Sequence, residues 1–105
     1  MAALTVHRNP NPATRKRIPF LVDLQSDLLV SLETRMVAPL YAKTATGPLP
    51  MLRLTPVVLF QGHEYLVMIP EMAGVPRRSL GVAVGDLSHL RGEIIAALDL
   101  LFTGF

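Results

Sequence analysis

The 105-residue chain contains no cysteine and no tryptophan. Without cysteine, neither a disulfide framework nor a thiolate metal site can form, which fits a reducing compartment. The most hydrophobic stretch, residues 94–102, is interrupted by Asp99 and is far shorter than the ~20 residues that span a bilayer. The first residues also lack the apolar run of a signal peptide. We therefore expect a soluble, cytoplasmic protein that does not contact a membrane.

The usual signatures of catalysis are missing as well. His7, His63 and His89 lie in unrelated segments, and the chain has neither a phosphate-binding glycine loop nor a Gly-x-Ser-x-Gly elbow. Asp23 and Asp27 would be about 13 Å apart in an extended strand, too far for a paired-carboxylate site. We expect Asp23 on the solvated face of its strand and Asp27 at the start of a turn. The expectation is a protein without enzyme activity, metal or cofactor.

Half of the residues are apolar and the net charge is only +2. This length and composition predict one domain over residues 1–105 with a buried core, and many domains of this size dimerise. The basic residues concentrate at Arg8 and in the triplet Arg15-Lys16-Arg17, with a lesser group at residues 77–78. This is too little charge to predict a nucleic-acid-binding protein from composition.

The most regular pattern predicts a helix over residues 86–105. Ser88 or Asp86 can accept a bond from a free backbone N–H at its start, and Gly104 suits its end because glycine tolerates positive φ. At about 100° per residue, one stripe of large apolar side chains should cover the core. The stripe consists of Leu87, Leu90, Ile94, Leu98 and Leu101, with Ile95 and Phe102 at its edge. The opposite face carries mostly small side chains, which suits either close approach by another protein or an ordinary helix end.

Alternating apolar residues and turn signals predict six or seven strands before this helix. We expect strands at residues 4–8, 18–25, 34–41, 51–54, 56–61, 64–69 and 77–81. The first two should form a hairpin with a proline-rich, basic loop, and Gly62 should turn the hairpin of residues 56–69. Pro39 should lie at an edge or bulge because proline cannot donate to a ladder. The predicted class is an α+β or mostly-β, barrel-like domain.

Two loops are candidate contact surfaces. Leu28 and Leu29 form an apolar pair without an alternating partner, which favours either contact with another molecule or a loop folded back on the core. The basic triplet in the first hairpin loop suits phosphates or an acidic partner, although such a charge run is more often a solvated hairpin tip.

Several stretches form a pattern that goes beyond these elements: Phe20–Asp27, Arg35–Leu40, Pro56–Val58, Met72–Pro76, Asp86–His89 and Leu101–Phe105. The pattern resembles the CcdB family, toxins of plasmid and chromosomal toxin–antitoxin modules that poison DNA gyrase. The motifs Val-Asp-x-Gln-Ser-Asp and Asp-Leu-Ser-His are specific. From about residue 20 onward the stretches follow the family order without insertion or deletion, and only the first hairpin loop is longer than usual.

The resemblance implies an SH3-like barrel-type antiparallel sheet, a small second sheet and a C-terminal helix, assembled as a homodimer. It implies no chemistry by the toxin itself, which binds the GyrA subunit of DNA gyrase and traps the complex with cleaved DNA, blocking replication and transcription. It further implies neutralisation by a CcdA-type antitoxin, with which the toxin co-represses its operon. DNA would then be contacted only indirectly, through gyrase or the antitoxin complex.

Carried over by position, the family's gyrase-binding residues correspond to Leu28, Leu29, Asp99, Phe102, Thr103, Gly104 and Phe105. The best-known pattern ends in Trp-Gly-Ile, and loss of the tryptophan's stacking on a gyrase arginine would weaken binding by about 1–2 kcal/mol per copy. We expect Phe105 or Phe102 to replace that contact and poisoning to be retained. Family antitoxins are acidic, so Arg15, Lys16 and Arg17 are the candidate antitoxin-binding residues.

Two rival functions stay open. A MazF-like endoribonuclease has a related fold, but it would need a base and a phosphate-holding cation converging on the sheet. RNA cleavage by the pure protein would identify it. The other rival is a non-poisoning homologue that only binds antitoxin, and Thr103 in place of tryptophan is the feature that allows it.

Overall fold

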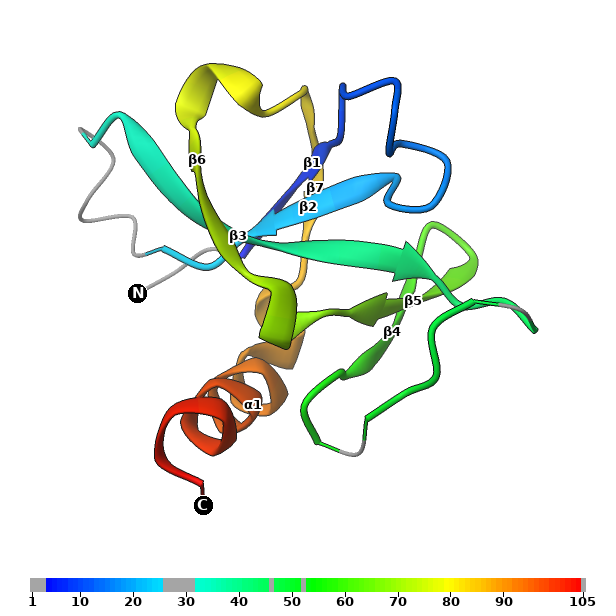
Figure 1. Ribbon diagram of the computed structural model, residues 1–105, viewed down its shortest axis with the longest axis vertical. Coiled ribbons are helices and arrows are strands. Elements are labelled where there is room, and N and C mark those ends of the chain that lie inside the picture. The colour runs from blue at the N-terminus through cyan, green and yellow to red at the C-terminus, as the bar shows by residue number, and fades with distance from the viewer. Residues whose placement is uncertain (1–3, 26–31, 46, 52, 105) are drawn as a thin grey trace.

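The computed structural model describes the whole chain except residues 1–3, 26–31, 46, 52 and 105. Within that part, seven strands form one antiparallel sheet, and one α-helix follows them (Figure 1). The strands are β1 (Thr5–Arg8), β2 (Phe20–Asp23), β3 (Thr34–Ala42), β4 (Val57–Phe60), β5 (His63–Val67), β6 (Ala73–Pro76) and β7 (Ala83–Asp86). The helices are α1 (Arg91–Thr103) and the 3-10 turns η2 (Ile69–Glu71), η3 (Arg77–Ser79) and η4 (Ser88–Leu90).

The strand order is β4-β5-β3-β2-β1-β7, and β6 branches from β3. β3 is the longest strand and lies at the centre. One of its sides pairs with β2, whereas the other pairs first with β6 over residues 34–37 and then with β5 over residues 40–42. The sheet curls into a half-barrel, with α1 packed at one end (Figure 1). The α+β class is confirmed, and the small second sheet appears as the β6 branch of the same sheet.

Pro39 therefore lies in a central strand, and it resembles an edge residue only on the side where β3 has no paired strand between β6 and β5. It pairs with Leu21 of β2, and its carbonyl accepts the Met68 N–H at 2.9 Å. On this side β3 changes partner from β6 to β5 between residues 37 and 40. Proline is tolerated here because no strand requires a donor at the change of partner.

The core lies inside the curl of the sheet. Phe20 packs edge-to-face on Phe60 and Tyr65, with ring centroids 5.3 and 5.5 Å apart. Aromatic pairs prefer this arrangement. The α-helix closes one end with Ile94 and Ala97, both fully buried. The largest fully buried side chains are Leu40, Leu66, Ile69, Leu87, Ile94, Val6, Val22 and Val67.

The helix is shorter than predicted at its start and ends where expected. Asp86 Oδ1 accepts the Ser88 backbone N–H at 3.0 Å and the Ser88 hydroxyl at 2.6 Å. These bonds lower the pKa of Asp86 and organise the turn η4, so the α-helix begins only at Arg91. Gly104 ends it with φ of +78° and donates its N–H to the Leu100 carbonyl at 3.0 Å, as a glycine C-cap does.

The predicted apolar stripe is confirmed at Leu87 and Ile94, which are buried, but not at Leu101, which is 37% exposed. Ala97 takes the buried place instead. The last turn of α1 points away from the sheet (Figure 1). Along α1, the buried residues therefore end at Ala97, although the apolar pattern continues to Leu101.

Two predicted strands were wrong. Residues 53–55 form a turn and bend, in which Leu54 and Thr55 each donate an N–H to the Met51 carbonyl at 3.0 Å. Residues 77–79 form η3, and the strands lie on either side of it, at 73–76 and 83–86. Those two segments contain glycine, alanine and proline, which have little intrinsic preference for strands. The hairpin of β4 and β5 is confirmed, with Gln61 and Gly62 both at positive φ, as a type I′ turn requires.

Candidate functional site

The C-terminal turns of α1 present an exposed apolar surface. The Phe102 side chain is 69% exposed and Ile95 is 48% exposed. These two residues and Asp99 are spaced so that they lie along one side of the helix, and Asp99 is also exposed. The surface therefore combines an aromatic ring, an aliphatic side chain and a carboxylate.

The end of this surface is held by bonds within the helix. The Thr103 hydroxyl donates to the Asp99 carbonyl at 2.6 Å, and Gly104 closes the last turn. The hydroxyl of Thr103 thus already has a partner inside α1. A protein that binds here would gain mainly from burying Phe102, because full burial of a phenylalanine contributes about 1.5–3 kcal/mol.

The structure brings four of the sequence-predicted gyrase-binding residues together on this surface. They are Asp99, Phe102, Thr103 and Gly104, and all are exposed. The other three, Leu28, Leu29 and Phe105, lie outside the described residues. The assignment of all seven residues to gyrase binding stays a prediction.

A buried ion pair lies directly before the segment that contains the loop leucines. Asp23 and Arg35 are only 8% and 5% exposed, and Arg35 Nε donates to Asp23 Oδ2 at 2.7 Å. The expectation that Asp23 faces solvent was wrong, because its partner lies 12 residues further along the chain, on the neighbouring strand β3. Asp27, which we expected at the start of a turn, lies outside the described residues.

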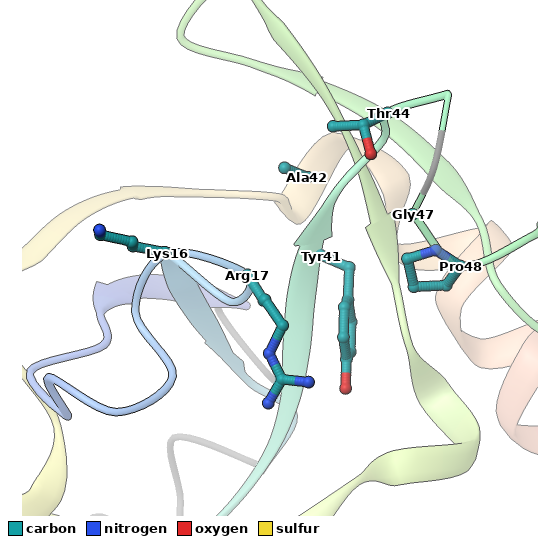
Figure 2. A pocket seen from close by; sticks show the side chains of 7 residues that line it. All are labelled: Lys16, Arg17, Tyr41, Ala42, Thr44, Gly47 and Pro48. Atoms are coloured by element: carbon teal, nitrogen blue, oxygen red, sulfur yellow. The ribbon is translucent and has the colours of Figure 1, made fainter.

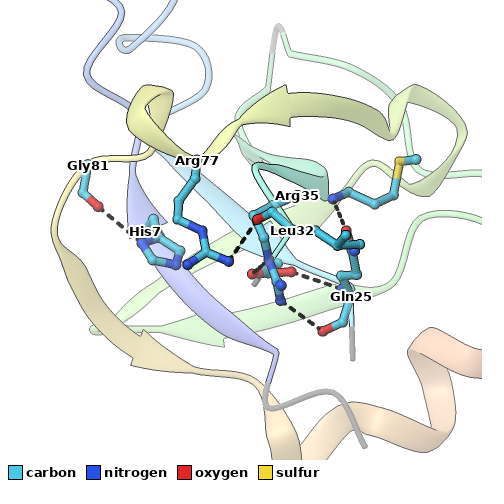
Figure 3. A network of polar contacts seen from close by, with 8 residues as sticks. His7, Gln25, Leu32, Arg35, Arg77 and Gly81 are labelled. Atoms are coloured by element: carbon cyan, nitrogen blue, oxygen red, sulfur yellow. Dashed lines mark hydrogen bonds and ion pairs between the residues drawn. The ribbon is translucent and has the colours of Figure 1, made fainter. Parts of the chain in front are cut away.

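The ion pair also fixes Gln25 (Figure 3). Asp23 Oδ1 accepts the Gln25 N–H at 2.9 Å, and Arg35 donates to the Gln25 carbonyl at 3.3 Å. The Gln25 side chain in turn accepts the Met36 N–H at 2.9 Å. These bonds hold the end of β2 against β3, which sets the point from which the chain enters residues 26–31.

The loop of the first hairpin is built around Asn9. Its side-chain amide donates to the Thr14 hydroxyl at 2.9 Å and to the Ile18 carbonyl at 2.8 Å, while its oxygen accepts the Asn11 N–H at 3.1 Å. Asparagine side chains favour such turns because they replace missing backbone bonds. The result is an ordered loop that exposes Arg15, Lys16 and Arg17.

A cavity of about 410 Å³ lies beside this basic loop. It is lined by Lys16, Arg17, Tyr41, Ala42, Thr44, Gly47 and Pro48 (Figure 2). The Tyr41 hydroxyl donates to Glu71 at 2.5 Å. Burial and the bond to Glu71 raise the pKa of Tyr41, whereas the nearby charge of Arg17 lowers it. Sequence reasoning found the two cations but missed Tyr41 and Thr44, because nothing in the pattern indicates that the end of β3 lies beside the loop.

The histidines remain separate in the fold. His7 Nδ1 bonds the Gly81 carbonyl at 3.0 Å (Figure 3), while His63 lies in β5 and His89 in η4. In the described part of the chain, no three His, Asp or Glu side chains come together as metal ligands. No helix among the described residues is long and apolar enough to cross a membrane.

The basic loop and the end of α1 lie at opposite ends of the molecule in the view of Figure 1. A family model described as CcdB protein matches residues 4–104. The match therefore covers the whole sheet, the basic loop and α1.

Proposed function

This chain belongs to the CcdB family of toxin–antitoxin toxins, and on that premise we propose that it binds the GyrA subunit of DNA gyrase and traps the complex with cleaved DNA. The observation that supports this most is the exposed Phe102 at the end of α1, beside Asp99. An aromatic side chain left this exposed is typical of a binding hot spot. The toxin itself performs no chemistry in this proposal, since gyrase makes the break.

The toxin acts as a homodimer in this proposal. A two-fold toxin dimer matches a two-fold gyrase gate, so each helix end makes its contacts twice. Binding that favours the cleaved, open state shifts gyrase towards that state, as any state-selective ligand must. Leu28, Leu29 and Phe105 complete the contact surface on the family pattern, with Thr103 in place of the family's tryptophan.

A CcdA-type antitoxin neutralises the toxin, and the two together repress their operon. The antitoxin contacts Arg15, Lys16 and Arg17, and the toxin meets DNA only through gyrase or the antitoxin complex. What supports this part is the exposure of the three cations on an ordered loop.

Calorimetric titration with the purified GyrA protein tests the gyrase contact. We expect Phe102→Ala to weaken binding about tenfold or more, because a buried aromatic contact is lost. Leu59→Ala is the matched control, since Leu59 is 68% exposed on the strand β4 and should change the affinity less than about twofold. Equal affinity of wild type and Phe102→Ala for GyrA would show that Phe102 at the end of α1 does not contribute to the contact.

A further inference from the structure

The cavity beside the first hairpin joins two segments that are distant in sequence. Lys16 and Arg17 come from the loop before β2, whereas Tyr41, Thr44 and Pro48 come from the end of β3 and the turn after it. In Figure 2 the Arg17 guanidinium and the Tyr41 ring point the same way, with Pro48 on the other side of the ring. The cavity thus has a cationic wall and an apolar wall, and its volume lies within the range of ligand pockets.

The two cations of this cavity, Lys16 and Arg17, take part in no ion pair among the described residues. No acidic residue precedes Asp23 in the sequence, while Arg8, Arg15, Lys16 and Arg17 all lie before it. Among the described residues, the ion pairs join Asp23 to Arg35 and Lys43 to Glu64, so none of these four cations takes part in one. An acidic group from outside the molecule is therefore attracted to this end without displacing an internal partner.

The nearby carboxylate of Glu71 is already engaged. It accepts the Tyr41 hydroxyl at 2.5 Å and keeps its negative charge, so it lies near Arg17 without forming an ion pair with it among the described residues. The geometry leaves the two cations exposed and gives the ring of Tyr41 a fixed orientation. Such a ring offers apolar contact to the backbone or side chain of an extended peptide.

We propose that this cavity binds an acidic segment of a partner protein, with one carboxylate held by Arg17 and the adjoining residue packed on Tyr41 and Pro48. Lys16, which points away from Arg17 in Figure 2, attracts a second acidic group of the same segment. The inference rests on the proposed function, in which that partner is the antitoxin. It adds Tyr41, Thr44 and Pro48 to the contact and makes the cavity, rather than the loop alone, the recognition site. The concave shape and apolar wall favour a peptide over the phosphates of a nucleic acid, which are held mainly by charge.

Tyrosine fluorescence reports occupancy of this cavity directly. The chain has no tryptophan and two tyrosines, and the second, Tyr65, is 7% exposed inside the core. The probe is a short peptide of alternating Glu and Ala, which has no fluorescence of its own. We expect a saturable change in tyrosine emission at low salt, and no change with the corresponding Gln-Ala peptide.

Substitutions locate the binding. Lys16→Gln combined with Arg17→Gln should weaken binding of the acidic peptide about tenfold, since two partly exposed charge contacts are lost. The control combines Arg53→Gln and Arg78→Gln, which removes the same charge from exposed positions outside the cavity. It should weaken binding less than about twofold.

Three results would overturn the proposal. They are equal binding of the Gln-Ala peptide, an equal loss in the control variant, and tighter binding of a short DNA duplex than of the acidic peptide through the same two cations. The last result would assign the surface to nucleic acid. The peptide titration contains no gyrase, so its failure is separate from that of the proposed gyrase poisoning, which is tested by gyrase binding and by DNA cleavage.

Discussion

The buried ion pair of Asp23 and Arg35 gives the sharpest prediction about stability. Arg35→Met removes the guanidinium that lies 2.7 Å from Asp23 Oδ2. The carboxylate then stays buried, and among the described residues it keeps the bond of its other oxygen to the Gln25 N–H. Leaving one member of a buried pair in place costs about 3–5 kcal/mol, because an uncompensated charge is then held away from water. We expect the free energy of unfolding to fall by that amount.

Urea denaturation measures this change, with the protein concentration held constant because the stability of the proposed homodimer would depend on it. For a domain of this size each kcal/mol corresponds to about 4–8 °C, so the melting temperature should drop by about 12 °C or more. Asp23→Leu combined with Arg35→Met should recover most of the loss, since no charge remains buried. A loss below about 1 kcal/mol in Arg35→Met would refute the reasoning, because that is the value of an exposed pair.

Four further predictions follow from single contacts. Gly104→Ala should lower the free energy of unfolding by about 1 kcal/mol in denaturant titrations, because φ is +78° there. Ile94→Ala should lower it by about 2–5 kcal/mol, since the side chain is fully buried. Burial and Glu71 raise the pKa of Tyr41 above 10.0. The stability that the protonated Tyr41 contributes is therefore present below pH 10 and is lost as the pH rises above 10. Melting curves above pH 10 should show that Tyr41→Phe loses less stability than wild type. Thr103→Trp should tighten gyrase binding up to about tenfold by calorimetry, because it restores a cation–π contact.

The sequence was sufficient for the elements that have strong local patterns. The hairpin around Gly62 was predicted because left-handed turn residues separate two alternating strands, and the helix end was predicted from Gly104. The exposed end of α1 was not predicted, since Leu101 and Phe102 were assigned to the core-covering stripe or its edge and are 37% and 69% exposed. The hairpin turn and the helix end depend on residues close together in the sequence, where spacing determines the geometry.

What the sequence could not provide depends on contacts between distant residues. Asp23 was assigned to solvent because apolar and polar residues alternate in its strand. In the structure it is buried, because it forms an ion pair with Arg35 of the adjacent strand. The strand β6 was missed because it is held by pairing with β3, about 40 residues earlier in the chain, and not by its own composition. The cavity beside the basic loop was missed for the same reason, since Tyr41 meets Arg17 only after the sheet has formed.

A gyrase cleavage assay tests the central claim most directly. Purified protein is incubated with active gyrase, supercoiled plasmid and ATP, and detergent and protease then release any trapped break. We predict linear DNA with the intact protein, and its disappearance when Gly104 and Phe105 are deleted. Absence of linear DNA with gyrases from several bacteria would contradict the account and would identify a homologue in which Thr103 marks the loss of poisoning.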